Sequence, residues 1–183
     1  MIIIQNMLTI PNLITFVRII LVPFFIYLLW HNIYDIPPKV VILFLAIIGT
    51  DALDGFTARL RKETSVVGSF IDPLADKLFF IPTFVILYLH DLVSYLVFFT
   101  YIVREILMIA GWIKIYTARK NIKTVVRLSG KVFTIAEAIF IFLILTKVDA
   151  KIINYASGLF VIITIYSVLD NIMSAKKIFY ETT

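Results

Sequence analysis

The chain has 183 residues, of which 61% are hydrophobic, and its 17 Lys+Arg against 12 Asp+Glu give a net charge of +5. Soluble domains are usually about half apolar, so this composition, with a mean hydropathy of +1.01, excludes an ordinary soluble domain. The absence of cysteine excludes disulfides, thiolate metal sites and a thiol nucleophile. We expect an all-α integral membrane protein with one domain over residues 1–183.

Six stretches approach the length of about 20 apolar residues that a helix needs to cross a bilayer. In chain order, the predicted transmembrane helices are Pro11–Trp30, Val40–Ala58, Val66–Leu89, Leu92–Ile113, Val132–Leu145 and Ile152–Leu169. Residues 1–8 are apolar but too few to cross, so we expect an interfacial segment along the membrane surface.

The loops between these stretches differ in positive charge, which predicts their orientation. One set holds Arg59, Arg61, Lys62, Lys114, Arg119, Lys120, Lys123, Arg127, Lys176 and Lys177. The other set holds only Lys39, Lys147 and Lys151. Cytoplasmic loops carry the excess of Lys and Arg, so both termini and the two basic loops are expected on the cytoplasmic side of the membrane. No nucleic-acid partner is expected.

Four aspartates interrupt the second and third predicted helices at shallow depth. At about 1.5 Å per residue, Asp54 and Asp51 lie ~7 and ~12 Å from the cytoplasmic end, and Asp72 and Asp76 lie ~9 and ~15 Å from it. Asp51 and Asp54 are three residues apart, and Asp72 and Asp76 are four apart, so each pair shares one helix face. The helices are joined by a short loop, so the two pairs can face each other.

Carboxylates brought this close repel one another unless cations lie between them. Without His or Cys ligands, hard divalent ions are the natural choice, and we expect two Mg²⁺ or Mn²⁺ ions. The alternatives are structural ion pairs with membrane-embedded cations such as Arg18 and Arg104, or a proton relay. A relay favours carboxylates strung across the membrane, whereas only Glu137 lies much deeper.

Small residues next to these acids indicate room for a ligand near the backbone. Gly55, Ala58 and Gly68 flank the carboxylates, although close helix packing also explains small residues in membranes. Arg59 follows at once and is a suitable bidentate donor to a phosphate.

Together these residues resemble the signature D-x2-D-G-x2-A-R-x8-G-x3-D-x3-D of the CDP-alcohol phosphotransferases. The matching positions are Asp51, Asp54, Gly55, Ala58, Arg59, Gly68, Asp72 and Asp76. The resemblance implies a homodimeric membrane enzyme with six helices that moves a phosphatidyl group from a CDP-linked lipid to an acceptor hydroxyl and releases CMP.

The same resemblance implies a role for each matched residue. Asp51, Asp54 and Asp72 would bind two divalent ions, with Asp76 also near the metals. Asp76 would act as the base that removes the acceptor proton. The residues implied for the CDP-lipid pocket are Gly55, Ala58, Arg59 and Gly68.

Other stretches are similar to bacterial phosphatidylglycerophosphate synthases, which use CDP-diacylglycerol and sn-glycerol 3-phosphate. The opening Thr9–Phe25 carries Asn12, either a helix cap or a contact of the CDP-lipid. Thr134 and the sequences Arg104–Ile106 and Gly130-Lys131 also match that group. The implied cations for the acceptor phosphate are Arg104, Lys131, Lys123, Arg127 and Arg18.

This chain differs from that group at two positions, Phe133 where Lys is typical and Glu137 where Gln is typical. Similarity also extends to cardiolipin synthases, whose acceptor is the membrane lipid phosphatidylglycerol. A different class remains open as well, a metal-ion transporter or scaffold that uses the same acidic layer. We expect glycerol 3-phosphate as the acceptor, with surrounding membrane lipids as further partners.

Overall fold

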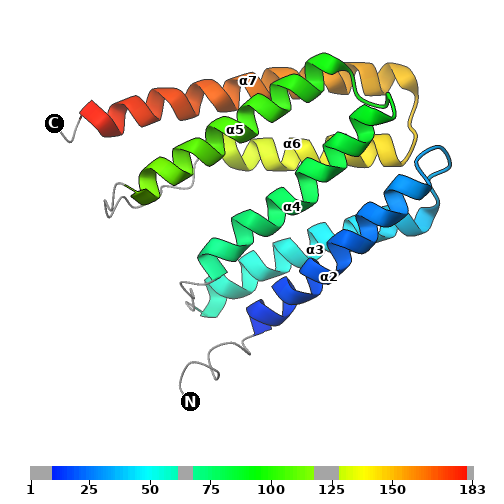
Figure 1. Cartoon of the computed structure of the whole chain (residues 1–183), viewed down its shortest axis with the longest axis horizontal. Coiled ribbons are helices and arrows are strands. Elements are labelled where there is room, and N and C mark those ends of the chain that lie inside the picture. Colours follow the sequence, from blue (N-terminus) through cyan, green and yellow to red (C-terminus); the bar gives the residue numbers. More distant parts are fainter. Residues whose placement is uncertain (1–9, 62–67, 118–127, 181–183) are drawn as a thin grey trace. The chain divides into compact units, whose positions relative to one another are not determined.

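The computed structural model describes residues 10–61, 68–117 and 128–180. All regular elements in these ranges are α-helices, which confirms the predicted all-α class for this part of the chain (Figure 1). Each predicted transmembrane stretch coincides with one helix. The helices are α2 (Ile10–His31), α3 (Pro38–Arg61), α4 (Gly68–Leu89), α5 (Tyr95–Thr117), α6 (Leu128–Leu145) and α7 (Ala150–Tyr180). The predicted interfacial segment 1–8 lies outside the described residues.

The helices α3, α6 and α7 are the ones that most exceed their predicted apolar stretches in length. The sixth stretch was predicted to end at Leu169, but α7 continues to Tyr180, and α6 begins at Leu128 rather than at Val132. Hydropathy marks where apolar residues stop, whereas a helix continues as long as its backbone hydrogen bonds and residue propensities support it. The polar residues beyond Leu169 therefore extend the helix past the apolar stretch.

Two helical stretches within the described residues are long and apolar enough to cross a bilayer, Leu128–Leu145 and Ala150–Met173. Two shorter apolar stretches occur at Ile20–His31 and Pro38–Thr50. Six membrane crossings therefore stay a prediction.

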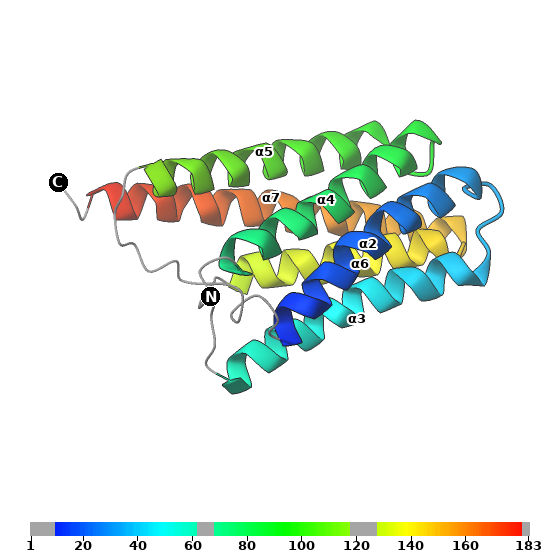
Figure 2. The ribbon, with the colours of Figure 1, turned by 60° about the horizontal axis from the view of Figure 1, so that its bottom comes forward.

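The helices divide into two compact units, Met1–His90 and Asp91–Thr183. In the first unit α2 lies beside both α3 and α4 (Figures 1 and 2). Three buried rings hold these helices together, because Phe25 of α2 lies 5.9 Å from Phe44 of α3 and 5.2 Å from Phe79 of α4, between ring centroids. Phe44 and Phe79 complete the cluster at 5.7 Å.

In the second unit α7 lies beside both α5 and α6 (Figures 1 and 2). Its buried Phe160 ring stacks on Phe140 at 4.9 Å and lies 5.6 Å from Phe133, both on α6. The predicted single catalytic domain over residues 1–183 stays a prediction.

Candidate functional site

An ion pair joins two of the predicted site residues in the first unit. Arg18 Nη1 of α2 lies 3.5 Å from Asp76 Oδ1 of α4. The Arg18 side chain is only 2% exposed, whereas the Asp76 side chain is 42% exposed. A buried guanidinium needs a charged partner, because an uncompensated charge is costly in an apolar environment. The ion pair therefore explains how the charge of Arg18 is tolerated in a buried position. The Asp76 carboxylate remains partly accessible.

The aromatic cluster of the first unit explains how these residues meet. Phe25 follows Arg18 by two helical turns on α2, and Phe79 follows Asp76 by about one turn on α4. The contact between Phe25 and Phe79 sets the register of the two helices. Packing thus places side chains that are 58 residues apart in sequence within reach of each other.

The other three motif aspartates lie on the same helices as the cluster. Asp51 and Asp54 belong to α3, and Asp72 belongs to α4. Their side chains are outside the part of the chain that the structure describes, and among the described side chains no group of three His, Cys, Asp or Glu is placed to hold a metal ion. The predicted two-metal site therefore stays a prediction, with Asp76 as its described member.

The structure also does not describe the side chains of several further predicted site residues. Lys123 and Arg127 lie outside the described residues. The helices α2, α3 and α4 include the positions predicted for the CDP-lipid pocket, but the structure does not describe their side chains. Those positions are Asn12, Gly55, Ala58, Arg59 and Gly68.

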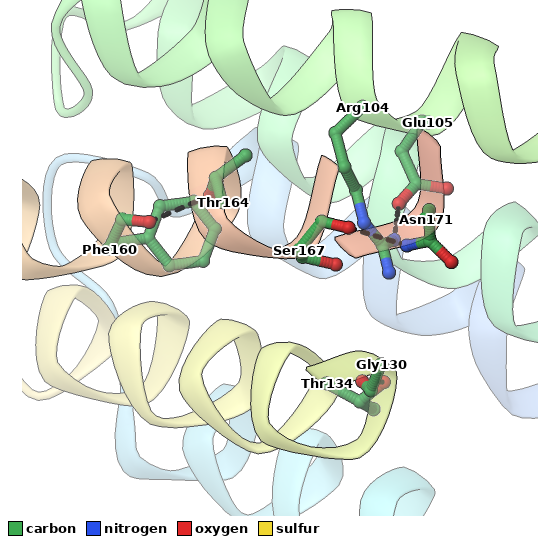
Figure 3. Close-up of polar contacts among 8 residues, drawn as sticks. All are labelled: Arg104, Glu105, Gly130, Thr134, Phe160, Thr164, Ser167 and Asn171. Atoms are coloured by element: carbon green, nitrogen blue, oxygen red, sulfur yellow. Dashed lines mark hydrogen bonds and ion pairs between the residues drawn. The ribbon is translucent and has the colours of Figure 1, made fainter. Parts of the chain in front are cut away.

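A second charged group lies in the second unit, around Arg104 of α5. Arg104 is 7% exposed and pairs with the neighbouring Glu105, which is 5% exposed. The guanidinium carbon Cζ also lies 3.6 Å from the centroid of the Phe133 ring on α6. In Figure 3 the Arg104 side chain points from α5 toward the part of α7 that carries Ser167 and Asn171. The predicted acceptor residue is thus buried and held in a defined orientation.

Lys131, another predicted acceptor residue, has a different environment. It is exposed near the start of α6. Two residues earlier, the Ser129 hydroxyl donates a hydrogen bond of 2.5 Å to Asp170 Oδ2 of α7. This bond fastens the start of α6 to α7, so Lys131 extends from an anchored helix end.

Three buried residues near Arg104 were given no role in the site by the sequence analysis. They are Glu105, Phe133 and Ser167, and the Ser167 Oγ has no hydrogen-bond partner among the residues described. Ser167 is a small polar residue inside an apolar stretch and precedes Asp170 by three residues, which was the available signal. Phe133 and Glu137, the two positions that differ from the synthases, are both buried and share one face of α6.

Comparison with known proteins supports the family resemblance that was inferred from the motif. Residues 8–169 match the family model for CDP-alcohol phosphatidyltransferase. The chain is 33% identical over 142 residues to the CDP-diacylglycerol–glycerol-3-phosphate 3-phosphatidyltransferase of Pectobacterium atrosepticum, covering 75% of this chain and 77% of the relative. It is 29% identical over 174 residues to the protein of that name from Shigella flexneri, covering 91% and 94%. A third protein of that name, from Blochmanniella floridana, is 37% identical over 101 residues, covering 54% and 53%.

Proposed function

Because the chain belongs to the CDP-alcohol phosphatidyltransferase family, we propose that it transfers a phosphatidyl group from CDP-diacylglycerol to sn-glycerol 3-phosphate. The products are phosphatidylglycerophosphate and CMP. The observation that carries the proposal is the position of Asp76, the last residue of the signature, half-exposed beside a buried arginine. Relatives that carry this enzyme name over most of the chain support the choice of acceptor.

In this mechanism Asp76 removes the proton from the acceptor hydroxyl. The oxygen then forms a bond to the phosphorus that bears the diacylglycerol, and the bond from that phosphorus to the CMP oxygen breaks. The proton passes from Asp76 to solvent after CMP has left. Arg18 holds the Asp76 carboxylate through their ion pair, which keeps one of its oxygens in a fixed direction.

We propose that Asp51, Asp54, Asp72 and Asp76 hold two Mg²⁺ or Mn²⁺ ions. The donor set consists only of carboxylates, which suits hard cations, and Asp76 is exposed enough to bind on the side away from Arg18. When bound, such ions neutralise charge on the transferred and leaving phosphates. Gly55, Ala58, Arg59, Gly68 and Asn12 are proposed to line the CDP-lipid pocket.

Metal removal gives the first test of this site. Excess EDTA should reduce CMP release to background, because carboxylates alone cannot neutralise the phosphates, and added Mg²⁺ or Mn²⁺ should restore it. The measurement is CMP release before chelation, after chelation and after each metal is returned. Full turnover in excess EDTA contradicts the metal proposal.

Arg104 is the best-described candidate for binding the acceptor phosphate. A guanidinium offers a planar fork of donors to phosphate oxygens, and this one is buried, oriented and close to the polar residues of α7. Lys131, Lys123 and Arg127 are proposed as further cations of the pocket. Arg18 contacts Asp76, so we propose that it orients the carboxylate, and its predicted contact with the acceptor stays a prediction.

We also propose six membrane crossings, with both termini and the active site on the cytoplasmic side of the inner membrane. The support is the apolar stretches of the helices and the asymmetric Lys and Arg in the loops. In this arrangement a lipid donor keeps its tails in the bilayer while its nucleotide reaches the cytoplasm. A homodimer surrounded by membrane lipids is proposed on the family resemblance alone.

One experiment tests the function against its alternatives. The purified protein is incubated with CDP-diacylglycerol, Mg²⁺ and one acceptor at a time, and CMP is measured. We expect release with glycerol 3-phosphate. Release only with phosphatidylglycerol favours a cardiolipin synthase, and no release with any acceptor favours a metal-ion transporter or scaffold.

A further inference from the structure

The Phe133 ring lies directly under the Arg104 guanidinium. The guanidinium carbon is 3.6 Å from the ring centroid, which is well inside the distance of about 6 Å at which a cation and an aromatic face attract each other. Both side chains are buried in the second unit. The attraction is stronger in such a site than at an exposed one, because less water competes for the cation.

The ring is itself held in place from two other helices. Phe133 is 0% exposed, Tyr101 of α5 stacks on it at 6.3 Å with an interplanar angle of 14°, and Phe160 of α7 lies 5.6 Å away. A close-packed aromatic ring cannot rotate without displacing its neighbours. Phe133 is therefore a fixed surface on which the guanidinium of Arg104 rests.

These contacts occupy one face and one donor of Arg104. Phe133 covers the face, and Glu105 accepts from Nη1, while the buried Nε has no hydrogen-bond partner among the described residues. A ring below the plane does not use the in-plane N–H groups. Arg104 is thus oriented by an apolar residue that leaves donors for a ligand.

We propose that Phe133 is a positioning residue, which fixes the Arg104 guanidinium in the plane that receives the phosphate of the acceptor. The inference rests on the proposed function and extends it to a residue that does not touch the acceptor. An aromatic ring at this position orients Arg104 without using its N–H groups. A carboxylate at the same position would accept hydrogen bonds from those groups and so compete with the phosphate. Its loss affects acceptor binding and not the transfer step.

The test compares Phe133→Leu with Phe133→Tyr. Leucine fills most of the space without an aromatic face, whereas tyrosine keeps the face. We expect Phe133→Leu to raise the KM for glycerol 3-phosphate by about 3- to 10-fold, with kcat and the KM for CDP-diacylglycerol within about twofold of the parent enzyme. Phe133→Tyr should keep the KM of the parent enzyme.

Phe140→Leu is the matched control, because Phe140 is equally buried on α6 and stacks on Phe160 in the same aromatic cluster. It should lower the melting temperature as much as Phe133→Leu does and leave the KM for glycerol 3-phosphate unchanged. If Phe133→Leu does not fold, Phe133→Met against Phe133→Tyr makes the same comparison.

The outcomes separate this inference from the function on which it rests. An unchanged KM in a folded Phe133→Leu enzyme, or an equal rise in Phe133→Tyr or Phe140→Leu, overturns the positioning role while the transferase activity stands. A parent enzyme that releases no CMP with glycerol 3-phosphate contradicts the proposed function, and the inference falls with it.

Discussion

Replacing Asp76 with Asn should lower the rate of CMP release by about 10²- to 10⁴-fold, which is the usual contribution of a general base. Asparagine has nearly the shape of aspartate but cannot accept the acceptor proton. Binding of CDP-diacylglycerol should remain measurable, because the substitution leaves the rest of the pocket intact. The measurements are single-turnover CMP release and CDP-diacylglycerol binding by the same purified protein.

Two controls separate chemistry from folding in this experiment. Asp76→Asn removes the charged partner of the buried Arg18, so the double variant Arg18→Gln/Asp76→Asn removes both charges and should fold with no buried charge left over. We expect it to be as inactive as the single variant. Asp35→Asn, in the exposed loop after α2, should keep full turnover. Substantial activity in Asp76→Asn removes Asp76 from the role of base.

Removing the positive charge of Arg104 should weaken acceptor binding more than removing any other charge in the second unit. The double variant Arg104→Gln/Glu105→Gln removes both charges of the buried pair, so neither is left uncompensated. We expect the KM for glycerol 3-phosphate to rise at least about 30-fold, which corresponds to a loss of ~2 kcal/mol from a charge-assisted contact. The KM for CDP-diacylglycerol should stay within about twofold.

The matched comparison for this result is Lys151→Gln, which removes an exposed cation outside the proposed pocket and should leave both KM values unchanged. Glu105→Gln alone keeps the guanidinium and should raise the acceptor KM less than the double variant does. A double variant that melts like the parent enzyme and keeps its KM for glycerol 3-phosphate shows that Arg104 does not bind the acceptor.

The sequence alone determined the parts of this protein that depend on neighbours along one helix. Apolar stretches predicted all six helices, and spacings of three and four placed the motif aspartates in pairs on shared faces, because helical geometry repeats within a few residues. The ends of α6 and α7 were less accurate, since hydropathy does not mark where a helix stops. The family also followed from local spacing, because its signature spans one loop and the two helix ends beside it.

Only the tertiary structure decided which distant side chains meet. Arg18 and Asp76 form a pair because Phe25 and Phe79 set the register of α2 against α4. Arg104 rests on Phe133 because α5 and α6 both pack on α7, whose Phe160 ring contacts Phe133. Such contacts depend on how ridges of side chains fit between helices, and no periodicity within a single helix contains that information.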